Sequence, residues 1–429
     1  MPPAPDPSPA RLRRRRRLRV SLRGLMALIL AIGVGLAWHL GQLRTQGSAV
    51  ATIRKAGGGV AYDFQFSRDP AVMRRIARNT QPPGPTWLRR WLGDDWFRTA
   101  VHVELLRPST PEVLAAVGRL HGLVQLRVGD TTGLAGAWGP VGRLRRLEEV
   151  WLVGPGVDDS ALAAVAASPG LEVIRLGKVA ATDGGIAELA QLGRLRDLSL
   201  NDCPHLTDAG VGRMLAASRS PRLASLSWSR FADSLPATIR ALADRHRTLR
   251  RLTLNFGPVE DADLAPIGAL GNLTDLGLIG TRVTDAGMVH LEPLAVLEGL
   301  TIEPAASTDR GLKSVGKLRG LTTLGLEGSP ASAFGLAEIA DLPRLKVLRL
   351  GDSNATDSGV DALARPPALE RLILVRTRVT GAGLAALQGV APLRELAVGG
   401  AAVTRAGLAE FREARPEVEV STEVPPPGR

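Results

Sequence analysis

The residues of this chain that could do chemistry fall mostly at one recurring position, a threonine or serine that an aspartate often follows. A row of such carboxylates could suggest bound calcium, but one carboxylate per unit supplies too few of the roughly six to eight oxygens that Ca²⁺ takes. We expect instead that the hydroxyl groups cap helices and that the aspartates favour the positive helix ends. The hydroxyl residues are Thr182, Thr207, Thr284, Thr308, Ser332, Thr356, Thr380 and Thr404, and the aspartates are Asp183, Asp208, Asp285, Asp309 and Asp357.

Recognised catalytic and metal-binding motifs do not occur in the sequence. It has no nucleophile elbow, no Walker loop and no paired-cysteine metal site. The only cysteine, Cys203, excludes an intrachain disulfide, and we expect it to be a buried structural residue and not a reactive thiol. The six histidines are scattered, with no pair at helical i, i+4 spacing. We therefore predict no catalytic residues, no metal site and no cofactor.

The elements that carry these residues repeat along the chain. Most central apolar positions are 24 residues apart, with two longer spacings of 28 and 26 on either side of Leu226. Such a period predicts a solenoid, an α/β horseshoe in which each unit adds one strand to a parallel concave sheet and one short helix to the convex side. We expect about twelve to thirteen repeats within residues 101–420. The central positions are Leu126, Val150, Ile174, Leu198, Leu226, Leu252, Leu276, Leu300, Leu324, Leu348, Leu372 and Leu396.

An apolar run precedes the repeats. Residues 24–43 carry no formally charged side chain, and at about 1.5 Å per residue a helix of this length spans the hydrocarbon core of a membrane. We expect a retained transmembrane helix, with the basic residues 1–23 disordered in the cytoplasm and the repeats outside. Residues 11–43 would contact membrane lipid, the arginines binding anionic headgroups. The alternative is a signal peptide cleaved after Ala37, which would leave a soluble periplasmic protein.

The net charge of +12 does not indicate nucleic-acid binding. Residues 1–23 hold eight arginines and one aspartate, whereas acids and bases are interspersed in the repeats. A nucleic-acid surface needs a continuous basic stripe. Residues 45–100 should form an N-terminal cap, within which Trp87, Trp91 and Trp96 are a possible docking site for a partner. Residues 421–429 should form a disordered tail.

The repeat signature resembles a known family. The L-x-x-L-x-L core and the V-T-D-A-G helix starts resemble leucine-rich repeat proteins, and residues 203–211 (CPHLTDAGV) look like the cysteine-containing subtype found in F-box-associated proteins. The anchor, GGGVAYDFQF and WLRRWLGDDWF are similar to membrane-anchored leucine-rich repeat proteins of planctomycete bacteria. This resemblance implies a bacterial interaction protein. No F-box precedes the repeats, which argues against a role as a ubiquitin-ligase substrate adaptor.

Candidate binding residues lie on the predicted concave face. Arg127, Trp151 and Arg175 are 24 residues apart and should stand side by side on adjacent strands. Tryptophan and arginine dominate interface hot spots, and an anionic or glycan-like ligand could stack there. In the simpler alternative, the tryptophan lies flat and the arginines only improve solubility. The aromatic residues in 227–231, at the longer units, are a second candidate.

These observations favour a non-catalytic scaffold, anchored in the cytoplasmic membrane, that binds a protein or an envelope polymer through its concave surface. The alternative is a structural spacer of the cell envelope without a discrete ligand.

Overall fold

The computed structural model describes residues 22–65, 81–92, 94–232, 234–303, 308–363 and 367–423. The predicted disordered tails lie largely outside these residues. Leu22 and Arg23, which we assigned to the first tail, belong to a helix. Ser421, which we assigned to the second tail, belongs to the last strand.

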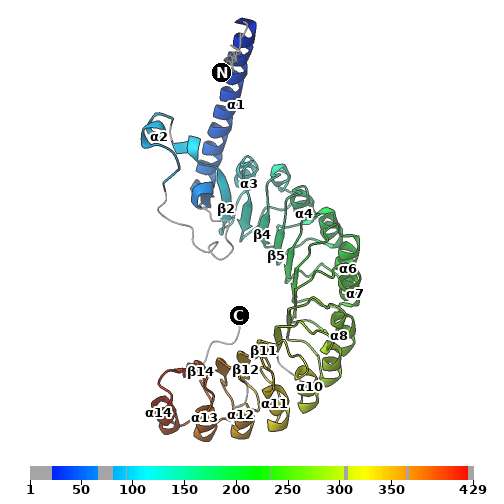
Figure 1. Ribbon diagram of the computed structural model, residues 1–429. Helices are drawn as coiled ribbons and strands as arrows, with labels where there is room; N and C mark the ends of the chain where they lie inside the picture. The colour runs from blue at the N-terminus through cyan, green and yellow to red at the C-terminus, as the bar shows by residue number, and fades with distance from the viewer. Residues whose placement is uncertain are drawn as a thin grey trace, which may run out of the picture.

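The described chain forms a single curved solenoid with its strands on the inner side and its helices on the outer side (Figure 1). The fifteen strands within these described ranges belong to one sheet, in the order of the sequence. The first two strands pair antiparallel and every later pair is parallel. The strands are β1 (Gly59–Tyr62), β2 (Ala100–Leu105), β3 (Gln125–Val128), β4 (Glu149–Val153), β5 (Val173–Gly177), β6 (Asp197–Asn201), β7 (Ser225–Ser229), β8 (Arg251–Asn255), β9 (Asp275–Ile279), β10 (Gly299–Glu303), β11 (Thr323–Gly325), β12 (Val347–Arg349), β13 (Arg371–Ile373), β14 (Glu395–Ala397) and β15 (Glu419–Ser421).

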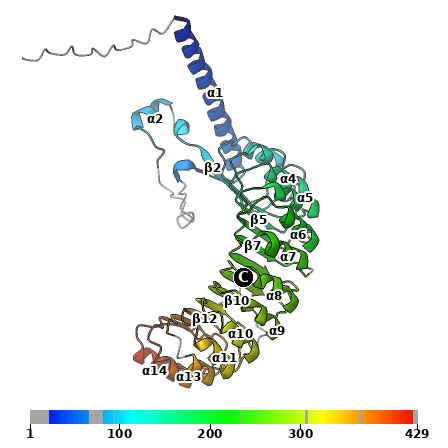
Figure 2. The ribbon, with the colours of Figure 1, turned by 45° about the vertical axis from the view of Figure 1, so that its right-hand side comes forward.

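Short helices follow most strands and cover the convex side of the sheet (Figures 1 and 2). The α-helices are α1 (Leu22–Lys55), α2 (Thr86–Leu92), α3 (Pro111–Val117), α4 (Asp159–Ala166), α5 (Asp183–Glu188), α6 (Asp208–Ala217), α7 (Pro236–Arg245), α8 (Asp261–Gly268), α9 (Asp285–Met288), α10 (Asp309–Val315), α11 (Ala333–Ala340), α12 (Asp357–Ala362), α13 (Gly381–Leu387) and α14 (Arg405–Ala414). The 3-10 helices are η1 (Asp63–Gln65), η2 (Asp94–Phe97), η3 (Val141–Arg143), η4 (Leu189–Gln191) and η5 (Val289–Leu291).

The core is a stack of aliphatic rows, as the 24-residue period predicts. The central residues of neighbouring strands are in register, so that Leu126 pairs with Val150 and Val150 with Ile174. All twelve central residues are at most 2 % exposed. Because each strand covers the apolar face of the one before it, no repeat has a closed core of its own.

The two longer units keep this register. Leu198 pairs with Leu226 and Leu226 with Leu252, so the extra residues lie outside the sheet. They lengthen α6 and α7, which have ten residues each. Trp228 and Phe231 are buried, their rings 5.5 Å apart. The aromatics at the longer units therefore fill the core, and our hypothesis that they form a surface site is wrong.

The first helix joins the solenoid directly. α1 contains the predicted span 24–43 but continues to Lys55. Its described apolar side chains from Leu25 to Leu40 are exposed, whereas Ala49, Val50 and Ile53 are part of the solenoid core. Among the described residues it is the one helix long and apolar enough to cross a membrane or to act as a signal sequence. The last turns of α1 thus close the apolar end of the first repeat, together with β1.

A buried arginine closes the other end. Arg415, at the end of α14, is almost fully buried, and its guanidinium donates hydrogen bonds to the backbone carbonyls of Gln388 (2.8 Å) and Val390 (3.0 Å). It also pairs with the Glu417 carboxylate. These carbonyls belong to the loop after α13. The arginine therefore donates to acceptors that would otherwise need donors from a further repeat.

Candidate functional site

The three predicted concave residues lie side by side on neighbouring strands. Arg127 on β3 pairs in register with Trp151 on β4, and Trp151 pairs with Arg175 on β5. The guanidinium carbon of Arg127 stands 4.0 Å from the centre of the Trp151 ring. This is a cation–π contact worth about 0.5–1 kcal/mol at an exposed site. We call these residues the concave cluster.

A chain of polar contacts runs along the row beside the concave cluster. The Gln125 amide lies between His102 Nδ1 (3.1 Å) and Glu149 Oε2 (3.1 Å). Glu149 in turn pairs with Arg175 (2.5 Å). Arg175 also lies 3.8 Å from Asp197, and Arg127 lies 3.3 Å from Glu104. The contacts cross five adjacent strands, β2 to β6.

The electrostatics of the concave cluster are balanced. Each guanidinium faces at least one carboxylate, and burial lowers the pKa of His102 from its usual value, so this histidine is neutral at pH 7. With Trp151 half-buried under Arg127, the tryptophan is less exposed than the sequence suggested. The arginines are therefore not free to neutralise a strongly anionic ligand. Arg127 holds Trp151 in one orientation, and both arginines offer their remaining N–H groups.

The middle of the concave face is small and polar. The row that contains Trp151 continues through Ser199, Ser227, Thr253, Gly277, Thr301 and Gly325. Beyond it, Arg349 lies 2.6 Å from Glu327 and 3.6 Å from Glu303. Burial and the neighbouring Glu327 carboxyl raise the pKa of Glu303 to about 8. The two glutamates thus share one guanidinium, and Glu303 favours its protonated form.

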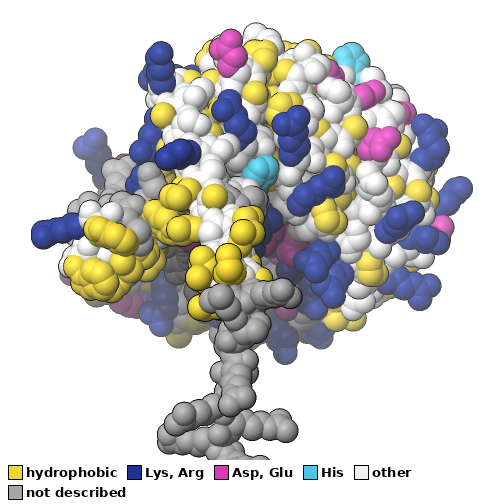
Figure 3. All heavy atoms as spheres, turned by 90° about the horizontal axis from the view of Figure 1, so that it is seen from above, with side chains coloured by type: hydrophobic (Ala, Val, Ile, Leu, Met, Phe, Trp, Pro, Cys, Tyr) yellow, Lys and Arg dark blue, Asp and Glu magenta, His cyan; other side chains and the backbone are white. Residues whose placement is uncertain are grey.

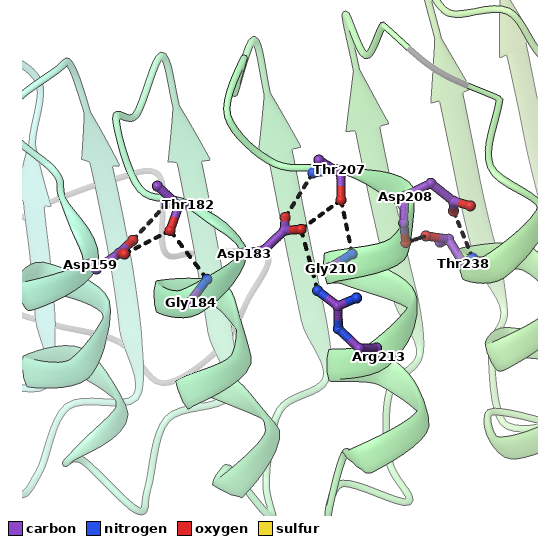
Figure 4. A network of polar contacts seen from close by, with 9 residues as sticks. All are labelled: Asp159, Thr182, Asp183, Gly184, Thr207, Asp208, Gly210, Arg213 and Thr238. Carbon is purple, nitrogen blue, oxygen red and sulfur yellow. Dashed lines mark hydrogen bonds and ion pairs between the residues drawn. The ribbon is translucent and has the colours of Figure 1, made fainter.

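The predicted capping residues do more than cap. All eight predicted Thr and Ser residues are N-caps, and seven of them accept a hydrogen bond from the first turn of their own helix. Each hydroxyl residue also donates to the aspartate of the preceding repeat where one is present. Asp183, for example, accepts from the Thr207 N–H (2.9 Å) and hydroxyl (2.6 Å), as Figure 4 shows.

We call this set of contacts between repeats the aspartate ladder. It includes the pairs Asp159–Thr182, Asp183–Thr207, Asp261–Thr284, Asp285–Thr308, Asp309–Ser332 and Asp357–Thr380. At α7, Asp208 instead accepts from the N–H groups of Ala237 and Thr238. The carboxylates are thus occupied by protein donors. Among the described residues, no group of three or more His, Cys, Asp or Glu side chains is arranged to hold a metal ion.

The ladder explains the glycine that follows each Thr-Asp pair. A Cβ at Gly210 would stand 2.0 Å from the Asp183 carboxylate, and one at Gly335 would stand 2.4 Å from that of Asp309. Only glycine leaves room for the carboxylate of the preceding repeat. The sequence shows the recurring T-D-x-G pattern, but the contact between repeats is visible only in the structure.

Cys203 is buried, as predicted. Its thiol points toward the Asn201 carbonyl (3.5 Å), and burial raises the pKa of Cys203 to about 11. A thiol with such a pKa is not a nucleophile near neutral pH.

One row of rim residues was missed by the sequence reasoning. Among the residues that the structure describes, six non-glycine residues have positive φ angles, at the position where other repeats have Gly280, Gly328 or Gly400. They are Lys178, Asp202, Arg230, Phe256, Asp352 and Arg376. Phe256 is 54 % exposed and lies under the Arg230 guanidinium, 5.9 Å from it. The sequence pattern that indicates these residues is the repeat position itself, which is glycine in some repeats and another residue in others.

The predicted docking tryptophans do not join the concave cluster. Trp87 and Trp91 lie on α2, which stands beside α1 and away from β3 to β5 (Figure 1). Both are strongly exposed, at 68 % and 79 %, and Trp96 is half-buried in η2.

Comparison with known proteins identifies the fold. No protein-family model matches the chain, and no curated protein matches it. The crystal structure of an internalin (inlF) from Listeria monocytogenes superposes with a TM-score of 0.51 at 20 % identity, over 72 % of this chain and 83 % of that one. A leucine-rich repeat protein from Leptospira interrogans, 16 % identical over 71 % of this chain and 91 % of that chain, superposes too loosely to carry an argument, with a TM-score of 0.35. Together with the strand–helix repeat, the first superposition shows that the chain has the fold of a leucine-rich repeat solenoid.

Proposed function

We propose that the protein is a non-catalytic scaffold, held in the cytoplasmic membrane by α1, that binds a protein or an envelope polymer through the concave cluster. The observation that carries this proposal is the Arg127–Trp151 stack on an open concave sheet. Solenoids of this kind present their concave surface to partners.

The chemistry of the concave cluster narrows the ligand class. Both arginines are already paired with carboxylates, so a strongly anionic ligand would have to displace Glu104 or Glu149. A polypeptide or a neutral glycan segment needs no such exchange. It would cover the Trp151 ring and take hydrogen bonds from the small polar row beside it.

The orientation of the protein follows from its N-terminal charges. The arginines that precede α1 favour the cytoplasmic side, so the solenoid would lie outside the membrane. The resemblance of the segment before the repeats to planctomycete proteins supports an envelope location in a bacterium. Intact-mass analysis of the mature protein tests the anchor, because a chain that begins at Trp38 would show that the apolar segment is a cleaved signal peptide.

Site-specific photo-crosslinking tests the binding site. A photoreactive residue at Ser199, the next position of this row on β6, leaves the concave cluster intact and should capture a partner of the full-length protein in native membranes. Trp151→Ala in the same chain should abolish the capture. The matched control is Thr301, which lies in the same row on β10. Equal capture at both positions would contradict the assignment to the concave cluster, and no capture at either would favour the envelope spacer.

A further inference from the structure

The short helix α2 presents a face of aromatic and cationic side chains. Trp87, Arg90 and Trp91 follow i, i+3, i+4 spacing, which places all three on one face of the helix. All three side chains are exposed, the two tryptophans at 68 % and 79 %. A soluble surface rarely leaves two neighbouring tryptophans uncovered, because each exposes a large apolar area to water.

The height of α2 along α1 is fixed by hydrogen bonds. Gln46 on α1 donates to the Arg98 carbonyl (3.0 Å) and accepts from the Ala100 N–H (3.1 Å). These two groups flank the end of the segment that runs from α2 through η2 into β2. The η2 helix also contacts α1. The Phe97 ring of η2 faces Gly84, just before α2, where a side chain would clash with it.

Gln46 marks the end of the apolar part of α1. The uncharged run ends at Leu43, Arg44 follows, and the solenoid core begins at Ala49. At about 1.5 Å per residue, only about 9 Å of helix separate Leu43 from Ala49. If α1 spans a membrane to Leu43, the first repeat stands directly at the membrane surface, and the attached α2 stands at the same level.

The views of the structure agree with this placement. In Figures 1 and 2, α2 projects beside α1, above the first strands of the solenoid. Seen from the end that α1 occupies, hydrophobic side chains gather on α1 and on the projection beside it, and Lys and Arg are frequent on the rest of this face (Figure 3).

We propose that α2 lies in the interfacial layer of the membrane that holds α1, with Trp87 and Trp91 among the lipid headgroups and Arg90 on their phosphates. This inference rests on the proposed membrane anchor. Tryptophan is enriched at this depth because its ring is apolar and its N–H finds acceptors there, and arginine reaches phosphate with several donors. The second contact would hold the solenoid at one tilt relative to the membrane.

Fluorescence quenching in lipid vesicles tests the proposal. The full-length protein carries an environment-sensitive probe at Arg90→Cys, which keeps both tryptophans, and is reconstituted in phosphatidylcholine–phosphatidylglycerol vesicles with or without brominated acyl chains. Native Cys203 is buried, which restricts labelling to the introduced cysteine. The matched control is Phe334→Cys, because Phe334 is an equally exposed aromatic, 83 % exposed, on the distant helix α11. A probe at Ile29→Cys reports the anchor itself.

We expect strong quenching at position 29, clear quenching at position 90 and none at position 334. Trp87→Ser with Trp91→Ser should reduce the quenching at position 90 and leave that at position 29 unchanged. Quenching at 29 with none at 90 would overturn the inference and leave the anchor intact. No quenching at 29 would overturn the proposed anchor. If the probe at position 90 is shielded from water but is not quenched by brominated lipid, a second copy of the chain covers α2. That result would overturn the inference too.

Discussion

Removing one carboxylate of the aspartate ladder should weaken the contact between two repeats by a measurable amount. Asp285 on α9 accepts hydrogen bonds from the N–H (2.7 Å) and hydroxyl of Thr308 and from the Gly311 N–H (3.0 Å). Hydrogen bonds to a charged group contribute about 1.5–3 kcal/mol each when both partners are shielded from water. Thr308 is exposed and Gly311 is buried, so water can replace the first two bonds but not the third.

From these contacts we expect Asp285→Ala to lower the free energy of unfolding by about 2 kcal/mol. Asp285→Asn should cost about half as much, because its amide oxygen still accepts from the two N–H groups. The control is Asp361→Ala on the exposed side of α12, for which we expect no more than about 0.5 kcal/mol.

The chain also offers the reverse experiment. Ala333 stands where the ladder would have an aspartate, and the Thr356 hydroxyl in the next repeat contacts the Ser358 hydroxyl (3.0 Å) but accepts no backbone N–H from the first turn of its own helix. A Cβ at Gly359 would stand 3.9 Å from the Ala333 Cα, compared with 2.8 Å between Gly335 and the Asp309 Cα. The wider gap has room for a carboxylate, so Ala333→Asp should stabilise the solenoid by about 1 kcal/mol.

Urea unfolding and amide hydrogen exchange measure these effects. A loss of about 2 kcal/mol corresponds to roughly thirty-fold faster exchange at Thr308 and Gly311, provided that exchange proceeds through opening of the α9–α10 contact. Unchanged exchange and an unchanged urea midpoint in Asp285→Ala would refute the reasoning. So would an Ala333→Asp variant that unfolds more easily than the parent chain.

Three further perturbations test other contacts. Burial and the Glu327 carboxyl raise the pKa of Glu303 from 4.5 to about 8, so between these pH values the folded state binds more protons than the unfolded state. The free energy of unfolding should therefore fall as the pH rises from about 5 to 8. Glu303→Gln should flatten this pH dependence in urea titrations at several pH values. Gly210→Ala should lower the free energy of unfolding by about 1–3 kcal/mol, because the new Cβ meets the Asp183 carboxylate. In a double-mutant cycle, Gly210→Ala should cost little when Asp183 is also replaced by alanine. Additive effects of the two substitutions would show that the clash is relieved elsewhere. Arg415→Ala leaves buried carbonyls unpaired and should lower the free energy of unfolding by about 3–5 kcal/mol, seen first as faster amide exchange in α14. Arg415→Lys should not restore the lost stability. Wild-type exchange rates in either variant would contradict this role of Arg415.

The sequence predicts the fold because every repeat carries the same apolar frame. The spacing of Leu126, Val150 and Ile174 is enough to derive strand order, register and the inward direction of each side chain. The same register places Arg127 next to Trp151 correctly. It cannot supply the ion pairs of Arg175, because Glu149 and Asp197 lie on the neighbouring strands β4 and β6, two residues before the row that contains Trp151.

The segment before the repeats follows no period, and here the sequence is less informative. An apolar run that ends at Leu43 suggests a helix that also ends there, yet α1 continues to Lys55 because Ala49, Val50 and Ile53 pack on the first repeat. Such packing depends on tertiary contacts and not on local composition. The role of Asp183 in joining two repeats was hidden for the same reason, because its partner Thr207 is a full period away.

If α1 anchors the protein as proposed, its unbroken course determines how the protein can leave the membrane. Many anchored ectodomains are released when a protease cuts an extended linker at the membrane surface, since a protease needs several residues in an unfolded conformation. Here the residues between Leu43 and Ala49 are helical, and the turns that follow are part of the core. A cut in this region would require the end of α1 to unwind, which would expose the apolar edge of the first repeat. Membrane release and loss of the N-terminal cap would then be one event, so a shed, folded solenoid should not accumulate.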